Sequence, residues 1–90
     1  TNPVGIVEGM KPVPLQIFPN PSRGLAKIYF EEEIAQYQDI AIYNTNGTLV
    51  FSHSIAAIQG KNEYFLPTYS FAQGIYYVKI GAQGAKLYVE

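Results

Sequence analysis

Acidic residues are the side chains in this sequence whose type and spacing come nearest to a chemical site. Three of the seven acidic residues are adjacent, Glu31, Glu32 and Glu33, and three neighbouring carboxylates could bind a metal ion or a basic partner. In an extended chain, however, successive side chains point to opposite faces, so the three carboxylates do not converge. We therefore expect this run to form a solvated loop or a charged guard on an edge strand.

No other residues make a catalytic or metal-binding pattern. His53 is the one histidine and cysteine is absent, and the sequence contains neither a Ser–His spacing nor a glycine-rich phosphate loop. Acid–base catalysis would need two carboxylates in one cleft, which their spacing does not require. The sequence thus predicts no enzyme, no cofactor and no metal site, and His53 is expected at a strand end without a chemical role.

Charge and hydrophobicity limit the partners. The formal net charge is −1 and the six Lys and Arg residues are scattered singly, whereas nucleic-acid binding requires a basic stripe. No run of about 18 consecutive apolar residues occurs, so no segment is expected to span a membrane. We expect neither a nucleic-acid partner nor a membrane span.

The aromatic residues leave a binding function open. The chain has eight Tyr and five Phe, and exposed rings such as Tyr29, Tyr43 and Tyr77 could form a stacking platform for a carbohydrate or another ligand. A structural spacer or adhesion domain is a further alternative, and composition does not separate these alternatives.

Short alternating apolar runs, separated by turn residues, dominate a chain of 90 residues, which is one domain. Strands are expected at residues 15–18, 25–30, 38–44, 49–55, 61–66, 75–80 and 86–89. No helical run is long enough to compete, so the pattern predicts an all-β fold, an antiparallel Ig-like β-sandwich of about seven strands, with a small barrel as the alternative. We expect residues 1–14 to be a linker that includes a short strand at residues 5–8.

Residues 15–24 are expected to organise the rest of the chain. A strand ends at Phe18 because Pro19 and Pro21 lack backbone donors and fix φ near about −65°. Asn20 precedes a proline and is held extended, and residues 22–24 supply a turn. We expect this two-proline corner, which ends at Gly24, to carry the chain from one sheet to the other.

Two later segments have specific expected geometries. Asn46-Gly47 between two alternating runs favours a type I′ turn, in which both central residues have positive φ. The strand after this turn is expected to direct Leu49, Phe51 and Ile55 to one face. Residues 56–60 are expected to be a loop, and Tyr69 and Phe71 are expected to pin a later loop to the core.

Three blocks in a fixed order carry a resemblance to a known family. They are Ile17-Phe18-Pro19-Asn20-Pro21 with Gly24, Ile40-Ala41-Ile42-Tyr43-Asn44 with Asn46-Gly47, and residues 71–80, closed by Lys86-Leu87-Tyr88-Val89. Together they resemble the C-terminal sorting domain of the type IX secretion system of the Bacteroidetes, the Por secretion tail family. That family shows a (Y/F)PNP motif, an (I/V)-Y-(D/N)-x-x-G hairpin and an L-x-x-G-(I/V)-Y-x-(V/I) strand.

The resemblance implies a secretion signal, with residues 15–90 as the sorting domain and a cargo domain preceding it in the same chain. The implied partners are the type IX translocon of the outer membrane and its sortase-like protease. The cargo would be in the periplasm during transit and then at the cell surface or outside the cell, and residues 1–11 would hold the cleavage site. The family often ends in a basic residue, whereas residue 90 is Glu.

The residues that match the family motifs are expected to act through the fold that a receptor reads. Glycines would hold turns, prolines would hold the corner, and two residues of the penultimate strand would pack beneath the last one. The signal residues carried over are Pro19, Asn20, Pro21, Gly24, Tyr43, Gly47, Gly74, Tyr76, Val78, Lys86, Leu87 and Val89. A receptor contact is expected on the final hairpin, residues 74–89, whose edge strand could offer backbone groups for strand addition.

Overall fold

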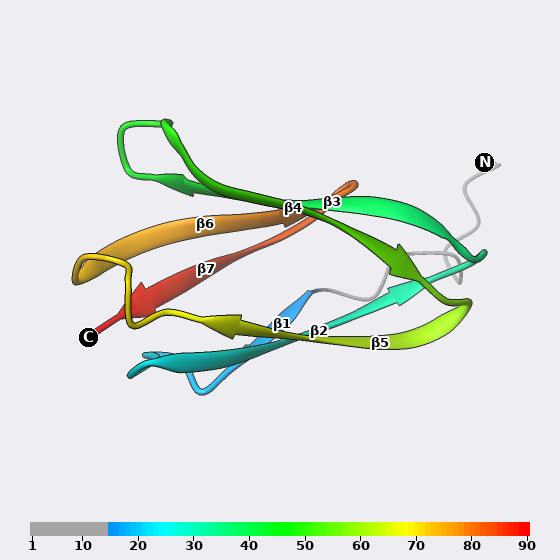
Figure 1. The fold of residues 1–90 in the computed structure, drawn as a ribbon, viewed down its shortest axis with the longest axis horizontal. Coiled ribbons are helices and arrows are strands. Elements are labelled where there is room, and N and C mark those ends of the chain that lie inside the picture. The colour runs from blue at the N-terminus through cyan, green and yellow to red at the C-terminus, as the bar shows by residue number, and fades with distance from the viewer. Residues whose placement is uncertain (1–14) are drawn as a thin grey trace, which may run out of the picture.

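Two antiparallel sheets make up the computed structural model, which describes residues 15–90. The strands are β1 (Gln16–Phe18), β2 (Leu25–Glu32), β3 (Gln36–Asn44), β4 (Leu49–Ala57), β5 (Gly60–Pro67), β6 (Gly74–Ile80) and β7 (Gln83–Val89). The order β1-β2-β5 forms one sheet and β4-β3-β6-β7 the other, and the two lie one above the other in Figure 1. The expected all-β sandwich is confirmed, and the barrel alternative is wrong because the strands form two separate sheets. The linker and short strand expected in residues 1–14 lie outside the described residues.

Alternating side chains on the two inner faces form the core. Each strand places every second residue inward, since successive side chains point to opposite faces of a sheet. The buried apolar residues of β2, β3, β5, β6 and β7 are Ala26, Ile28, Phe30, Ile40, Ile42, Leu66, Tyr76, Val78, Ile80, Leu87 and Val89. These assignments match the inward positions that alternation predicts for β2, β3, β6 and β7.

The strand order is Ig-like, with one difference from the constant-type domain. There the fourth strand belongs to the first sheet, whereas here β4 pairs with β3 in the second sheet. The reason is local, because residues 45–48 form a tight hairpin that returns the chain directly beside β3. The chain crosses between the sheets later, at residues 58–59 and again at residues 68–73.

The β3–β4 hairpin differs from the type I′ turn expected for Asn46-Gly47. Gly47 N donates to Asn44 O over 3.0 Å, and Asn44 Oδ1 accepts hydrogen bonds from the backbone N of Asn46 and of Thr48. Within this hairpin only Gly47 has positive φ, at 81°, and every positive-φ residue of the described chain is a glycine. The turn is therefore of type I followed by a left-handed glycine. The expectation failed because the Asn44 side chain satisfies the loop amides that a type I′ turn would leave free.

A β-bulge reverses the expected direction of Leu49. Ile42 pairs with Phe51 but Tyr43 pairs with Leu49, so Val50 is an extra residue in β4. Phe51 and Ile55 still pack against the core, whereas Leu49 lies on the outer face and is 50% exposed. Adding one residue shifts all preceding side chains to the other face.

The acidic run is part of a strand, so the expected solvated loop or edge guard is wrong for two of its residues. β2 continues through Glu32, which pairs with Gly60 of β5. Alternation turns Glu32 inward, where it is 9% exposed and accepts hydrogen bonds from the side-chain amides of Gln36 and Gln38. The carboxylate thus has neutral donors.

Two further strand boundaries and one loop contact differ from the sequence expectation. The loop expected at residues 56–60 is wrong for most of that range, because β4 continues to Ala57 and β5 begins at Gly60. His53 therefore lies within β4 and not at its end, with its ring 5.8 Å from that of Tyr64 in β5. β7 begins at Gln83, because the hairpin before it needs only Gly81 and Ala82. In the loop after β5, Phe71 packs against the core but Tyr69 is 80% exposed.

We expect Gly47→Ala to lower the free energy of unfolding by about 1–2 kcal/mol, because a side chain at positive φ is strained. A Cβ at this position would meet no atom within 4 Å, so the loss would come from backbone conformation and not from a clash. Urea unfolding of both proteins measures it. Asn46→Ala, one residue earlier at negative φ, is the matched control and should change the midpoint little. Equal midpoints for the Gly47 variant and the wild type would contradict this account of the turn.

Candidate recognition site

The proline corner joins two strands of one sheet. β1 pairs antiparallel with β2, with Ile17 opposite Ile28, so the expectation that the corner carries the chain between sheets is wrong. Both X-Pro bonds of the corner, Phe18-Pro19 and Asn20-Pro21, are cis. The corner instead reaches sideways from its own sheet to β7, the edge strand of the other sheet.

The side chain of Asn20 binds the backbone of β7. Its Nδ2 donates to Lys86 O over 3.0 Å, and its Oδ1 accepts from Tyr88 N over 2.8 Å. Strands at a sheet edge leave alternate N–H and C=O groups without a neighbour. The carboxamide supplies one acceptor and one donor to these groups, in place of a neighbouring strand.

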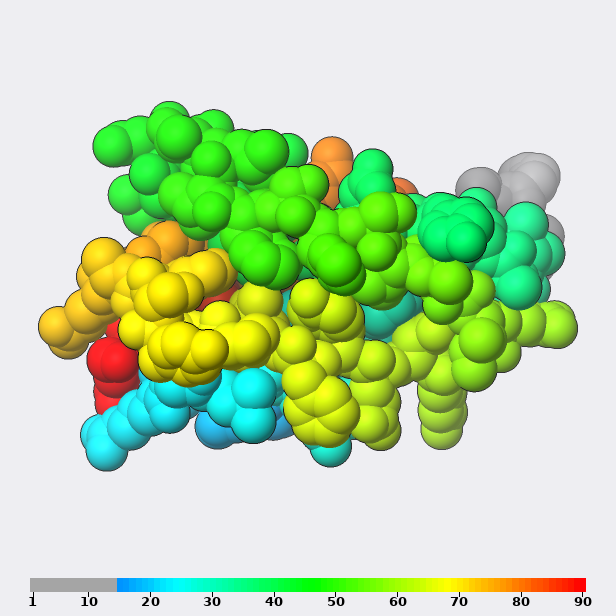
Figure 2. All heavy atoms as spheres, in the orientation of Figure 1, coloured from blue at the N-terminus to red at the C-terminus, as the bar shows by residue number. Residues whose placement is uncertain are grey.

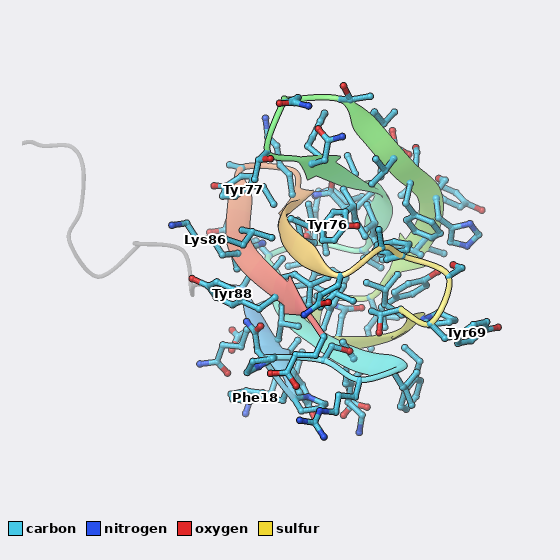
Figure 3. All side chains as sticks on the ribbon, turned by 90° about the vertical axis from the view of Figure 1, so that its left-hand side faces the viewer. Phe18, Tyr69, Tyr76, Tyr77, Lys86 and Tyr88 are labelled. Atoms are coloured by element: carbon cyan, nitrogen blue, oxygen red, sulfur yellow. The ribbon has the colours of Figure 1, made fainter. Side chains whose placement is uncertain are left out.

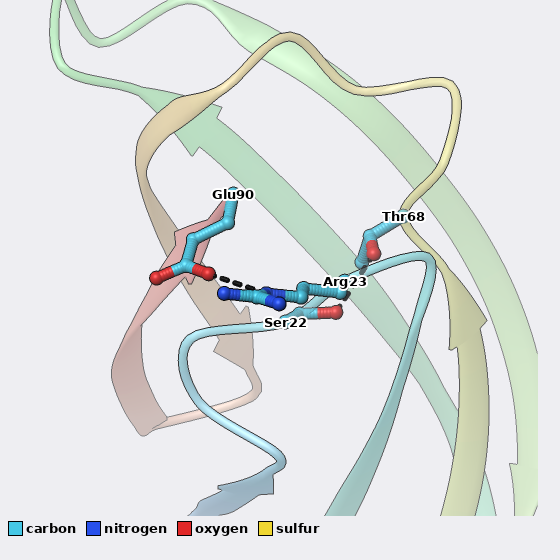
Figure 4. A network of polar contacts seen from close by, with 4 residues as sticks. All are labelled: Ser22, Arg23, Thr68 and Glu90. Atoms are coloured by element: carbon cyan, nitrogen blue, oxygen red, sulfur yellow. Dashed lines mark hydrogen bonds and ion pairs between the residues drawn. The ribbon is translucent and has the colours of Figure 1, made fainter.

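Ser22 continues the same contact through its backbone. Ser22 N donates to Tyr88 O over 2.7 Å, and Glu90 N donates to Ser22 O over 2.9 Å, so Ser22 and Val89 form a parallel bridge. Its hydroxyl lies 2.7 Å from the Thr68 hydroxyl, and both residues are buried. Thr68 N also donates to Gly24 O over 2.8 Å. These bonds tie the corner, β7 and the loop after β5 together (Figure 4).

An ion pair lies at the surface of this contact. Arg23 Nε donates to Glu90 Oε1 over 2.6 Å, with the two side chains 81% and 42% exposed. An exposed pair of this kind adds at most about 1 kcal/mol, because water and salt screen it. The contact therefore depends mainly on the backbone and on Asn20.

We call this contact the tail junction and define it by Asn20, Ser22, Thr68 and residues 86–90. The junction brings together two groups of expected signal residues that lie more than 60 positions apart, with the bonded pairs separated by 66 and 68 positions. The members of the corner are Pro19, Asn20, Pro21 and Gly24, and those of the last strand are Lys86, Leu87 and Val89. Sequence spacing alone gives no sign of this juxtaposition.

The remaining expected signal residues lie beside or away from the junction. Gly74 pairs with Val89 at the start of β6. Tyr76 and Val78 are buried on the inner face of β6, the strand beside β7, and Figure 3 shows Tyr76 inside the sandwich. Tyr43 and Gly47 belong to the β3–β4 hairpin and are not part of the junction. The signal residues thus form a junction, the core beneath it and a separate hairpin.

Two junction residues were not found from the sequence. Ser22 and Thr68 are fully or almost fully buried polar residues, and buried hydroxyls normally have a hydrogen-bond partner. Each follows a proline directly, Pro21 or Pro67. That position marks a turn residue, but it does not identify the partner.

The expectation of strand addition at the end of the final hairpin also changes. The outward backbone groups of β7 at Lys86 O, Tyr88 N, Tyr88 O and Glu90 N are already bonded to Asn20 or Ser22. A partner strand could pair over residues 86–90 only by displacing the corner. The expectation is therefore wrong for this half of the edge.

The three tyrosines proposed as a stacking platform do not lie together. Tyr29 alternates with buried residues of β2 and lies on the outer face of the β1-β2-β5 sheet. Tyr43 and Tyr77 are paired on the outer face of the other sheet, and Figure 3 shows Tyr77 outside the ribbon near Lys86 and Tyr88. A single platform of these three rings is excluded because two sheets separate them.

Residues 15–90 contain neither a cluster of metal-binding side chains nor a helix that could cross a membrane. Within them, no group of three or more His, Cys, Asp or Glu residues is placed to hold a metal ion. No helix in the same range is long and apolar enough to cross a membrane.

Comparisons with known proteins give one family and one fold relative. The family model described as "Secretion system C-terminal sorting domain" matches residues 16–89. Among solved structures, a chain titled "structure of AaCel9A in complex with cellobiose-like isofagomine" is similar at 19% identity with a TM-score of 0.55. The match covers 74% of this chain and 12% of that one, so it supports the fold alone. The search of curated proteins gave no match.

Asn20→Ala should loosen the end of β7 because it removes both hydrogen bonds to its edge. We expect a loss of about 1–2 kcal/mol in unfolding free energy and faster hydrogen exchange at the Tyr88 amide, measured by NMR. Asn20→Asp keeps the acceptor for Tyr88 N but loses the donor to Lys86 O, so its Tyr88 amide should stay more protected. Identical Tyr88 exchange in the wild type and Asn20→Ala would show that the carboxamide does not hold this edge.

Proposed function

The chain belongs to the family of secretion system C-terminal sorting domains, and on this premise we propose that the type IX translocon recognises residues 15–90 as a folded signal. Its sortase-like protease then removes this signal. The domain is a type IX sorting signal for a secreted or surface cargo. The family is one of secretion signals and not of enzymes. The proposal adds transit through the periplasm, recognition of the folded domain and cleavage before Leu15.

The tail junction is the observation that supports recognition of the folded state. Asn20 from the corner and Lys86 to Val89 from the last strand form one surface only when both sheets are assembled. A receptor that binds this surface would accept folded domains and reject unfolded chains, whatever the cargo. A receptor for many cargoes needs such a shared feature, because the cargo sequences themselves differ.

The carbohydrate-binding alternative receives no support from the arrangement of the tyrosines, since Tyr29 lies on the opposite sheet from Tyr43 and Tyr77. The relative whose title mentions a cellobiose-like compound shares the fold over 12% of its own chain. Neither observation indicates a sugar site on this domain.

The first test is export of a reporter. We expect a periplasmic reporter fused ahead of residues 1–90 to reach the surface or medium of a type IX-competent bacterium. Deleting residues 86–90 should block export. It removes half of the pairing between β7 and β6 and all of the bonds between β7 and the corner. Glu90→Ala is the control and should still be exported, since it removes only an exposed ion pair. Retention of the intact fusion in the periplasm would contradict the proposed function.

The second test is the position of the new terminus. Mass spectrometry of the exported reporter should find a chain that ends within residues 1–11, while the retained precursor keeps residues 15–90. The paired strands of residues 15–90 are the physical reason, because proteases cut paired strands less readily than exposed segments. Exported reporter that still carries residues 15–90 would contradict the cleavage step and leave sorting intact.

A further inference from the structure

The four edge strands of this sandwich are protected to different degrees. Natural edges are blunted by shortness, charge, proline or a covering segment. β1 has three residues and is followed by Pro19, β5 carries Lys61, Glu63 and Pro67, and the end of β7 is bonded to the corner. Each of these three edges therefore has a feature that opposes pairing with another chain.

β4 is different among the edges formed by residues 15–90. Its sequence, LVFSHSIAA, is nine residues long and contains no Asp, Glu, Lys, Arg, Pro or Gly. Its one bulge is at Val50, so the remainder of the strand runs with regular pairing to β3. A long, uncharged and regular edge is a template for strand addition.

The backbone groups available on β4 follow from the ladder. Asn44 N donates to Thr48 O at the hairpin, and bonded and non-bonded pairs then alternate along an antiparallel pair. Followed from this pair through the bulge, the alternation means that the N–H and C=O groups of Ser52, Ser54 and Ala56 point away from β3. The same alternation across the sheet agrees with the outward groups observed on Tyr88 of β7.

A pocket opens beside the first half of β4. Its volume is about 460 Å³, and its lining includes Val50, Phe51, Ser70, Phe71, Ala72 and Tyr76. The rings of Phe51 and Phe71 are 6.2 Å apart and those of Phe71 and Tyr76 5.2 Å apart, so the wall is aromatic. Tyr76 Oη donates to Ala72 O over 2.6 Å and holds the rim of the pocket. Figure 2 shows the loop after β5, in yellow, lying below the green β3–β4 hairpin.

We propose that β4 is where an extended segment of a translocon protein adds as a strand, with one bulky apolar side chain in the pocket lined by Phe51 and Phe71. The inference rests on the proposed function and adds a second contact surface, at the sheet edge opposite the tail junction. In strand addition, main-chain hydrogen bonds give affinity and pockets for alternate side chains give specificity. The segment should be uncharged where it lies against β4, because β4 offers no charge to pair with one.

A second copy of this chain fits the site less well. In an antiparallel pair of β4 strands, the far half of one strand would lie opposite the pocket of the other. That half supplies Ser54, Ile55, Ala56 and Ala57, of which only Ile55 is bulky. Ile55 already packs against its own core, so a second copy leaves the pocket unfilled.

Two substitutions test the site with the reporter fusion to residues 1–90. Ser54→Pro removes an outward N–H and leaves the ladder to β3, as prolines on edge strands do. Ser70→Trp fills the pocket from its exposed rim. We expect each to reduce export of the reporter at least about tenfold, equivalent to about 1.4 kcal/mol of lost binding. The control is Tyr69→Trp, because Tyr69 is 80% exposed and is not part of the pocket lining.

The outcomes separate this inference from the proposed function. Failure of the wild-type fusion to be exported would contradict the proposed function itself. Wild-type export together with normal export of folded Ser54→Pro and Ser70→Trp proteins, checked by circular dichroism and urea unfolding, would overturn the inference alone. Concentration-dependent self-association of residues 1–90 that Ser54→Pro abolishes, measured by sedimentation, would assign β4 to a second copy and also overturn it.

Discussion

The pairing of the proline corner with the last strand is the constraint on which this domain depends. β7 has β6 on one side only, and an edge strand leaves outward N–H and C=O groups without a strand to pair with. Asn20 and Ser22 bind four of these groups at Lys86, Tyr88 and Glu90. The two ends of residues 15–90 are joined in this way, since the corner follows β1 directly and Glu90 is the last residue. The sandwich is closed on this side by a turn and not by another strand.

This closure makes the corner and the last strand one structural unit. Without β7 the Asn20 carboxamide would lack its two backbone partners, and without the corner the outward groups of β7 would be unpaired. The buried hydroxyl pair of Ser22 and Thr68 adds the loop after β5 to the same unit. A mutation in any of the three segments therefore also changes the stability of the other two.

The two sides of the sandwich consequently have different properties. On the β7 side the edge groups are bonded within the domain, and the exposed Arg23–Glu90 ion pair adds little. On the β4 side the edge is uncharged and lies next to an aromatic pocket whose lining includes Phe71, Ala72 and Tyr76. The four-stranded sheet of the described residues thus has one edge closed by the corner and one edge without a covering segment.

Local sequence determined the strands and their inward faces, because alternation acts between neighbouring residues: Ile40 and Ile42, Val78 and Ile80, and Leu87 and Val89 are buried as the pattern predicts. It also determined that Pro19 and Pro21 end β1 and that Gly47 adopts positive φ. Tertiary structure alone decided the bulge that turns Leu49 outward, the continuation of β2 to Glu32 against β5 and the bonds from Asn20 to β7. These features depend on a partner distant in sequence or on the register of a neighbouring strand, and no pattern of adjacent residues encodes either one.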